Sequence, residues 1–346
     1  MTILITGATG FIGRHLCAHL TANQVPVVAL MRNPEKLTSL RQQVTALDGQ
    51  GDLISVISGD LDQPGLGLKQ PMPQGIRAIV HLGARFAWGM APETAQRTNV
   101  NGSLAVAQLA RQLQCRLVYV SGFMLENTDH LARLGINLNA LDQTDWNTVY
   151  QRAGSYEASK LEGALKTRVY ADKHAMDWVE IQPATLTGSV ERGELDPAQP
   201  LFQLIDNLNH GRLAMVPGTA KDWLPLVSVD TLVRLISAAI EAQNPPPRLL
   251  ALDPATPNLK GLLALLAKPL DRQAPARHIP KKLLALLLKI PGLATKLNTA
   301  PESLHFIQPA RFDTGVSMAF MAQHSISMPA IEQVVLRNAR WYHQRC

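Results

Sequence analysis

Short apolar runs alternate with longer helix-like stretches along the first two thirds of the chain. Each run is nearly continuous in apolar residues, which is typical of strands that are buried on both faces of a parallel sheet. The stretches between them predict helices, among them 12–22, 92–112 and 156–174. This alternation predicts an α/β fold with a doubly wound parallel sheet. The runs predict strands at residues 2–6, 25–31, 53–57, 78–82, 117–121 and 178–182.

The alternation breaks up after Pro183. A loop with several glycines and prolines leads to a predicted helix at 201–208, a short strand at 226–229 and a helix at 231–242. Three prolines at 245–247 separate this part from a leucine-rich end. We therefore expect two domains. Residues 1–183 with about 224–255 are assigned to a nucleotide-binding domain, and about 184–223 with 256–346 to a smaller, mostly helical lobe that covers the substrate.

Three glycines follow the first predicted strand, in the segment ILITGATGFIG. Gly7 permits a tight turn, Gly10 lets the backbone approach a pyrophosphate, and Gly13 lets the next helix pack closely on the sheet. The helix that begins near Phe11 offers unpaired N–H groups and the positive end of its dipole to phosphates. Because strand, spacing and helix agree, the segment predicts a dinucleotide site rather than a plain turn.

The end of the second predicted strand distinguishes the two nicotinamide cofactors. An acidic residue there accepts a hydrogen bond from the ribose 2′-hydroxyl, whereas an arginine pairs with a 2′-phosphate. The sequence has Arg32 at this place, in ALMRNPEK, with no acidic residue beside it. NADP(H) is therefore the expected cofactor. Arg14 offers a second positive group, although Arg14 and Lys36 are equally consistent with ordinary surface charges.

Tyr156 and Lys160 stand four residues apart in YEASK, so a helix places both side chains on one face. An ammonium group near a phenol favours the phenolate and lowers the pKa of the phenol. Tyr156 can then act as a general acid or base toward a carbonyl or an alcohol. The pair gains weight because it follows a dinucleotide motif and precedes a further buried strand.

Together these motifs resemble the extended, or atypical, short-chain dehydrogenase/reductases of the NAD(P)-dependent epimerase/dehydratase-like superfamily. The resemblance implies a Rossmann fold with the site at the carboxyl ends of the strands. It also implies that Tyr156 donates or accepts the proton, and that Lys160 is its electrostatic partner and binds the nicotinamide ribose. The motifs follow the family's order across roughly the first 255 residues: TGATGFIG, GDL at 59–61, VHLGA at 80–84, NVNG at 99–102, YEASK, QPAT at 182–185 and VSVD at 227–230.

The resemblance further implies which residues contact the cofactor. Asp60 would lie near the adenine, and His81, Gly83 and Asn99 along the cofactor. Packing explains a histidine at the end of a strand equally well. The implied cofactor contacts are Gly7, Thr9, Gly10, Phe11, Ile12, Gly13, Arg32, Asp60, Leu61, Leu82, Gly83, Ala84, Asn99, Lys160, Pro183 and Thr185.

The sequence departs from the family at the end of the fifth predicted strand. The family usually has Ser-Ser or Ser-Thr there, and the second hydroxyl polarises the substrate carbonyl. This chain reads LVYVSGFMLEN, which places Ser121 first and Gly122 second. Loss of one such donor costs about 10² to 10³ in rate. The open alternatives are that Ser121 reorients and is catalytic, that water or Thr185 substitutes, that Tyr156 acts alone, or that the protein binds cofactor without turnover.

Two features favour an apolar substrate. The segments QPATLTGSVERGE and LPLVSVDTLV are similar, in patches, to thioester-reductase-like and male-sterility-type members of the superfamily, which act on acyl chains held by a carrier. Bulky side chains near the expected site would line an apolar pocket more readily than a sugar-nucleotide pocket. These are Phe86, Trp88, Phe123, Met124 and Leu125.

A leucine-rich stretch at 278–297 is flanked by lysines. It suits a core or dimer-packing helix, a lid over an apolar substrate, or a surface helix that rests on a membrane. These alternatives stay open, so a homodimer and a peripheral membrane contact through 278–297 are both candidate interactions.

Composition narrows the class of protein. With 46% hydrophobic and 17% charged residues, the chain of 346 residues is expected to fold. Cys17, Cys115 and Cys346 have neither metal-ligand spacing nor an even disulfide set, which predicts a reduced, cytoplasmic protein without a metal site. The apolar runs are too short to span a bilayer, and a first strand at Thr2 leaves no room for a signal peptide. A net charge of +6 and 5% aromatic residues give no sign of a nucleic-acid surface.

The sequence therefore predicts an NADP(H)-dependent oxidoreductase that transfers hydride to or from an apolar carbonyl or alcohol, such as a lipid, a steroid-like molecule or an acyl compound. One alternative is a nucleotide-sugar epimerase or dehydratase, which shares the fold and the tyrosine. The other is a non-catalytic NADPH-binding sensor, which Gly122 favours and the Tyr156/Lys160 pair disfavours.

Overall fold

The computed structural model describes residues 2–345, which divide into two compact units. The first unit comprises Met1–Gln182 and Val233–Leu249, and the second comprises Pro183–Leu232 and Leu250–Cys346. The segment that returns to the first unit is therefore shorter than the predicted 224–255. The predicted strand near residue 226 pairs with another short strand inside the second unit.

A seven-stranded sheet forms the centre of the first unit, in the order β10-β6-β5-β4-β1-β2-β3. The neighbouring pairs from β3 across to β6 are all parallel. The order 3-2-1-4-5-6 is that of a Rossmann fold, and it confirms the six strands predicted for this part of the chain. The strands are β1 (Thr2–Thr6), β2 (Val27–Met31), β3 (Ile54–Ser58), β4 (Ile76–His81), β5 (Arg116–Val120), β6 (Trp178–Pro183) and β10 (Arg248–Ala251).

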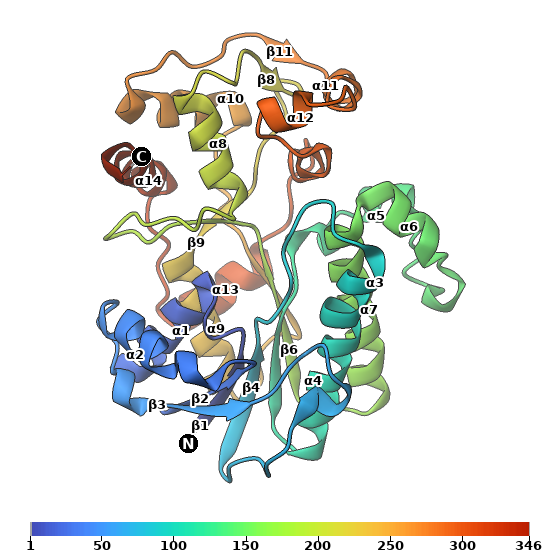
Figure 1. Cartoon of the computed structure of the whole chain (residues 1–346), viewed down its shortest axis with the longest axis vertical. Helices are drawn as coiled ribbons and strands as arrows, with labels where there is room; N and C mark the ends of the chain where they lie inside the picture. The colour runs from blue at the N-terminus through green and yellow to red at the C-terminus, as the bar shows by residue number, and fades with distance from the viewer. Residues whose placement is uncertain (1, 346) are drawn as a thin grey trace. The chain divides into compact units, whose positions relative to one another are not determined.

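The strands at the centre of the sheet are apolar because both of their faces are covered. All five residues of β2 and the last four of β1 and β5 are buried. Helices α1 (Phe11–Ala22), α2 (Leu37–Thr45) and α9 (Val229–Glu241) lie on one side of the sheet, and α4 (Gly102–Gln112) and α7 (Ser155–Lys173) on the other (Figure 1). The predicted doubly wound arrangement is thereby confirmed.

The stretch predicted as one helix at 92–112 has an irregular middle. Helix α3 (Pro92–Ala95) continues through a π-helical turn, Gln96–Asn101, into α4. Two shorter helices, α5 (Thr128–Leu134) and α6 (Trp146–Ala153), precede α7. Asn127 caps α5 by accepting a hydrogen bond from the backbone of His130, and Asp145 caps α6 in the same way through Asn147. A π-helical turn often marks a functional segment, and this one carries Asn99.

The second unit is mostly helical, as predicted. Two pairs of short parallel strands, β7 (Thr185–Thr187) with β9 (Leu226–Ser228) and β8 (Val216–Pro217) with β11 (His278–Ile279), accompany its helices. Leucines from α8 and α10 and residues of α14 form its apolar core. The helices are α8 (Pro200–Asn209), α10 (Leu259–Ala267), α11 (Lys281–Leu287), α12 (Leu293–Lys296), α13 (Gly315–Gln323) and α14 (Ile331–Arg345).

Two of the three cysteines lie in the described part of the chain, in the first unit. Cys17 and Cys115 are buried free thiols, and burial raises the pKa of Cys17 to about 12 and that of Cys115 to about 11. Both are therefore inert packing residues at neutral pH. Cys346 lies outside the described residues.

No helix within residues 2–345 combines the length and the apolar character needed to cross a membrane.

Candidate functional site

The glycine turn after β1 is shaped by close backbone contacts. Gly7 has φ +75°, a conformation that glycine adopts without strain, and a Cβ there would lie 2.8 Å from the backbone nitrogen of Gly83. A Cβ on Gly13 would collide with the carbonyl oxygen of Gly7. A Cβ on Gly10 would meet only that same oxygen, at 3.3 Å, so the space beside Gly10 is open. The turn and the helix contact therefore need Gly7 and Gly13, while Gly10 leaves room for a ligand.

A cavity of about 440 Å³ lies at the carboxyl ends of β1, β2 and β4, where ligands bind in Rossmann folds. Nine of the predicted cofactor residues line this cavity: Gly7, Thr9, Gly10, Arg32, Asp60, Leu61, Leu82, Gly83 and Ala84. The cavity therefore brings together residues from four separate motifs. It fits a dinucleotide, because it combines an open glycine directly before α1 with basic side chains at one end.

The basic end of the cavity holds Arg32 and Lys36, beside Asn33. Both basic side chains are exposed. Arg14 does not line the cavity, and its Nη1 donates instead to Oε1 of Gln43 at 3.4 Å. The sequence left open whether Arg14 and Lys36 bind the cofactor or are ordinary surface charges. In the structure Lys36 lines the cavity, whereas Arg14 lies on α1 outside it.

The remaining predicted cofactor residues do not line the cavity. Phe11, Ile12 and Gly13 form the first turn of α1. Lys160 lies on α7 in the first unit, and Pro183 and Thr185 belong to the second unit. Phe11, Ile12 and Gly13 therefore place their backbone N–H groups at the start of α1, next to the glycine turn.

A polar cluster on the cavity wall was not predicted from the sequence. Arg85 pairs with Asp62, Nη2 to Oδ2, at 3.2 Å, and Thr98 donates a short hydrogen bond to the same carboxylate. Asn99 accepts from the backbone nitrogen of Arg85 at 2.7 Å and donates to Oγ of Ser159 at 2.9 Å. Asn99 therefore joins the loop after β4 to α7. Asp62 and Arg85 each follow a quoted motif by one or two residues, and that spacing was the available signal.

His81 has a structural role. Its ring nitrogens lie 2.7 Å from Oγ1 of Thr6 and 3.0 Å from Oγ of Ser103, and the side chain is 2% exposed. Burial, with a contribution from the charge of Lys160, lowers the pKa of His81 to about 3. The ring is neutral at physiological pH and joins β1, β4 and α4. Packing, one of the two interpretations left open, is therefore the one its contacts support.

Tyr156 and Lys160 lie one turn apart near the start of α7. Nζ of Lys160 donates to the carbonyl oxygen of Val120 at 3.0 Å and lies 5.8 Å from the centre of the Tyr119 ring. Burial lowers the pKa of Lys160 to about 8, and Glu180 opposes this shift. Lys160 is thus tied to the end of β5, beside Ser121.

The pKa of Tyr156 departs from the expectation that Lys160 would lower it. Burial raises the pKa of Tyr156 above its ordinary value, and the neighbouring carboxylate of Glu157 raises it further. The physical reason is the loss of hydration, which disfavours the charged phenolate, while Nζ of Lys160 donates to the carbonyl oxygen of Val120. Tyr156 therefore holds its proton and is available as an acid.

A buried ion pair lies beneath the end of β5. Oγ of Ser121 donates to Oε1 of Glu180 at 2.5 Å, and Nε of Arg168 donates to Oε2 at 2.5 Å. Glu180 lies within β6 and is fully buried. The Ser121 hydroxyl is therefore hydrogen-bonded to a buried carboxylate of the sheet. Glu180 was not predicted as a site residue, although a glutamate inside the apolar run WVEIQ is unusual.

Gly122, which follows Ser121, has open space where a side chain would be. No atom lies within 4 Å of an ideal Cβ at this position. Its backbone, with φ −177° and ψ 151°, is extended and suits any residue. The glycine is therefore not required by packing or by backbone conformation.

Aromatic side chains surround Tyr156. The ring centres of Phe86 and Trp88 lie 4.4 Å and 6.0 Å from that of Tyr156, both edge to face. Phe123, Met124 and Leu125 are buried instead, with at most 4% of each exposed. Of the predicted apolar pocket residues, the structure thus brings Phe86 and Trp88 to Tyr156.

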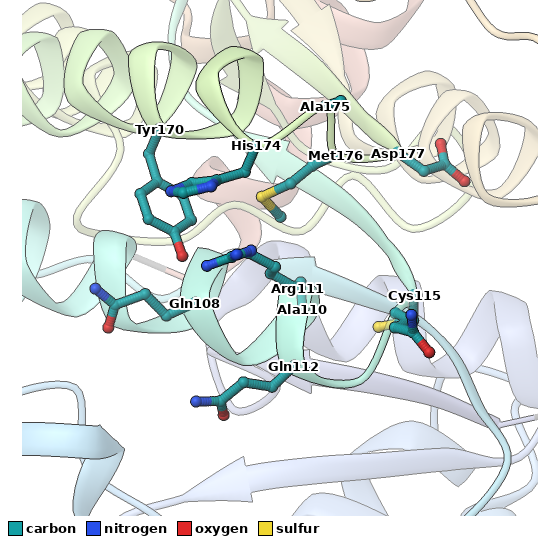
Figure 2. A pocket seen from close by; sticks show the side chains of 11 residues that line it. Gln108, Ala110, Arg111, Gln112, Cys115, Tyr170, His174, Ala175, Met176 and Asp177 are labelled. Atoms are coloured by element: carbon teal, nitrogen blue, oxygen red, sulfur yellow. The ribbon is translucent and has the colours of Figure 1, made fainter.

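A second cavity, of about 1000 Å³, lies at the other end of the strands, near the amino ends of β5 and β6 (Figure 2). Figure 2 shows the rings of Tyr170 and His174 next to each other, and their centres are 4.5 Å apart. Arg111 and Asp177 also line it. None of the predicted site residues does, so the candidate site is the cavity at the carboxyl ends.

Comparison with known proteins agrees with this geometry. Two fungal proteins match the chain over 261 residues, or 69% of its length: the hybrid PKS-NRPS synthetase poxE of Penicillium oxalicum, 28% identical, and the NRPS-like oxidoreductase fscA of Fusarium equiseti, 25% identical. The chain covers 6% of the first and 24% of the second.

Two solved structures share the fold. The terminal R domain of the myxalamid PKS-NRPS pathway has a TM-score of 0.76 and 18% identity, with 99% of this chain and 91% of that one covered. The UDP-glucuronic acid 4-epimerase from Bacillus cereus, in complex with UDP-glucuronic acid and NAD, has a TM-score of 0.66 and 16% identity, with 99% and 98% covered.

A family model described as the NAD dependent epimerase/dehydratase family matches residues 3–250. This match spans the sheet of the first unit, the glycine turn, the cavity and the Tyr156/Lys160 pair. The chain therefore belongs to the NAD-dependent epimerase/dehydratase family and is an NAD(P)-dependent enzyme of the extended short-chain dehydrogenase/reductase type.

Proposed function

We propose that this protein is an NADP(H)-dependent oxidoreductase that transfers hydride to or from an apolar carbonyl or alcohol. The observation that carries the proposal is the placement of Tyr156, which sits one turn from Lys160 and is surrounded by Phe86 and Trp88. A phenol that holds its proton, set among apolar rings, suits proton transfer to an apolar carbonyl.

The chain's own residues supply binding and the proton. NADPH, when bound, supplies the hydride that adds to the carbonyl carbon. The Tyr156 hydroxyl gives its proton to the carbonyl oxygen, and the charge of Lys160 stabilises the phenolate that this leaves. Lys160 and Asn99 are proposed to contact the cofactor, with Gly7, Thr9, Gly10 and the first turn of α1 at its phosphates. Pro183 and Thr185 complete the proposed cofactor contacts.

The names of the relatives support an oxidoreductase. They include an NRPS-like oxidoreductase and a terminal R domain of a PKS-NRPS pathway. An apolar substrate agrees with the rings of Phe86 and Trp88 at Tyr156. We also propose that the protein is cytoplasmic. That it forms a homodimer stays a prediction from the sequence.

The function is tested by following NADPH oxidation with purified protein and a panel of long-chain, aromatic and steroid-like aldehydes and ketones. Turnover with an apolar carbonyl is the expected result. Binding of NADPH without turnover of any member of the panel would contradict the proposal. Copurification of tightly held NAD would instead favour the epimerase alternative.

The preference for NADP(H) is expected to depend on Arg32. Replacing Arg32 with alanine removes a charged partner for the 2′-phosphate, so the Kd of NADPH should rise about 10- to 100-fold, because a hydrogen bond to a charged group contributes about 1.5 to 3 kcal/mol. The Kd of NADH, which lacks this phosphate, should change by less than about threefold. Isothermal titration or fluorescence quenching measures both constants.

Arg14→Ala is the matched control for Arg32→Ala. Both residues are arginines near the glycine turn, but only Arg32 lines the cavity. Equal losses of NADPH affinity in the two variants would show a general effect of surface charge, and the assignment of the 2′-phosphate to Arg32 would be wrong.

Activity is expected to fall as pH rises through about 8. The ammonium form of Lys160 exists below its pKa of about 8, so each pH unit above that value removes most of the remaining charged form. The charged and titratable groups around it are Glu180 on β6, Tyr119 on β5, His81 on β4 and Tyr156 on α7. The pH profile of kcat/KM for NADPH reports this group in the free enzyme.

The substitution Glu180→Gln should move this fall in activity to lower pH. The glutamine keeps an oxygen for Ser121 but removes the negative charge that favours protonated Lys160. Asp177→Asn is the matched control, because Asp177 is an exposed carboxylate at the other end of β6, paired with Arg116. If the fall of the pH profile stays at the same pH in Glu180→Gln, the charge of Glu180 does not influence the protonation of Lys160.

A further inference from the structure

The net charge of the chain is concentrated in one segment. Residues 272–301 contain six basic residues and no acidic residue. The whole chain has 33 basic and 27 acidic residues, so outside this segment the two signs are equal in number. This basic segment lies in the second unit. The six residues are Arg272, Arg277, Lys281, Lys282, Lys289 and Lys296.

The same segment exposes large apolar side chains. Leu283, Leu286 and Ile290 are 48%, 63% and 51% exposed, and they are three of the eight large apolar side chains exposed within residues 2–345. Leu283 and Leu286 lie three residues apart in α11, so they share one side of the helix. Three such side chains within eight residues form a cluster, which indicates an interaction surface.

The opposite side of α11 is already packed. Leu284 packs against the apolar core of the second unit, and Leu288, the residue that follows α11, is 3% exposed within that core. Nζ of Lys281 donates to Oδ1 of Asp222 at 2.6 Å and to the carbonyl oxygen of Ile307 at 2.5 Å, which fixes the start of the helix. The outer side chains therefore cannot turn inward without breaking these contacts.

We propose that Leu283, Leu286 and Ile290, with Lys282 and Lys289, form a surface that binds an anionic phospholipid membrane; we call it the α11 surface. Its apolar side chains would enter the boundary between headgroups and acyl chains, while its exposed ammonium groups stay at the headgroup phosphates. An anionic leaflet attracts lysines near its surface, and added salt weakens that attraction.

Charge complementarity favours a lipid leaflet over a second copy of this chain. A second copy would bring an identical α11 surface, with the same positive charge and no acidic residue within 272–301 to pair with it. An anionic leaflet supplies both a negative layer and an apolar layer beneath it. The α11 surface has the matching two parts, and it needs no rearrangement of the second unit to present them.

The test is co-sedimentation of the full chain with vesicles, and it does not depend on the proposed enzymatic activity. We expect binding to vesicles of equal parts phosphatidylglycerol and phosphatidylcholine, little binding to phosphatidylcholine alone, and release as salt is raised. Leu286→Asp should weaken binding about tenfold or more, and so should the double variant Lys282→Glu with Lys289→Glu.

Val316→Asp is the matched control, because Val316 is 59% exposed on α13 in the same unit and lies outside the α11 surface. It should bind vesicles as the unaltered protein does. The proposal is overturned if the unaltered protein ignores anionic vesicles, as it would if an acidic protein were the partner, or if Leu286→Asp binds as well as Val316→Asp. Circular dichroism of each variant verifies that the fold is kept.

Discussion

Replacing Tyr156 with phenylalanine is expected to lower kcat for carbonyl reduction by about 10² to 10⁴, the usual contribution of a positioned general acid. The affinity for NADPH should stay within about threefold, because Tyr156 does not line the cavity that holds the glycine turn and Arg32. Stopped-flow or steady-state absorbance of NADPH measures kcat, and titration measures affinity. The loss therefore separates chemistry from cofactor binding.

The variant should fold, because phenylalanine keeps the ring that packs edge to face with Phe86 and Trp88. Tyr170→Phe is the matched control on the same helix. Tyr170 lies near the other end of α7, where its ring contacts His174. If the two variants reduce carbonyls equally fast, Tyr156 is not the acid, and the proposed reaction loses its main support.

Much of the first unit could be predicted because its signals are local. A parallel strand buried on both faces is recognisable without knowing its neighbours, and the glycine turn specifies its own backbone. Strand partners are not local. The run that becomes β9 has the same apolar character as any strand of the large sheet, yet it pairs with β7 in the second unit. Its pattern indicated burial but not the partner strand.

The candidate site shows the same limit. Arg32 and the glycines could be assigned from position, since each stands at a fixed offset from a strand end. Glu180 could not, because its role depends on Ser121 and Arg168, which come to it from β5 and α7. The pKa of Tyr156 was also beyond the sequence. Four-residue spacing reveals a lysine one turn away but not the burial that raises the pKa of Tyr156.

This buried cluster argues against a catalytic role in which Ser121 replaces the hydroxyl that Gly122 lacks. Its Oγ donates to a carboxylate that also holds Arg168, so turning the hydroxyl away would leave part of a buried charge unpaired. Such a group is costly to leave without its hydrogen bond. We therefore expect Ser121→Ala to affect stability more than kcat, and the carbonyl to lack a protein hydroxyl from this strand end.

Gly122→Ser is accordingly expected to raise kcat for carbonyl reduction. The extended backbone and the open space around an ideal Cβ mean that serine fits without strain. Removal of a comparable donor costs other enzymes about 10² to 10³ in rate, and a donor added without further adjustment should recover at least about tenfold. Steady-state kinetics with a fixed apolar aldehyde measures the gain.

Gly122→Ala is the control that isolates the hydroxyl, because it adds the same Cβ to the same open space. It should leave kcat near that of the unaltered protein. A gain that appears equally with alanine would come from a stiffer backbone rather than from a hydrogen bond to the carbonyl. A different outcome is that the unaltered protein binds NADPH without turnover while Gly122→Ser reduces the aldehyde. That result would identify the chain as a cofactor sensor that lacks only the hydroxyl at position 122.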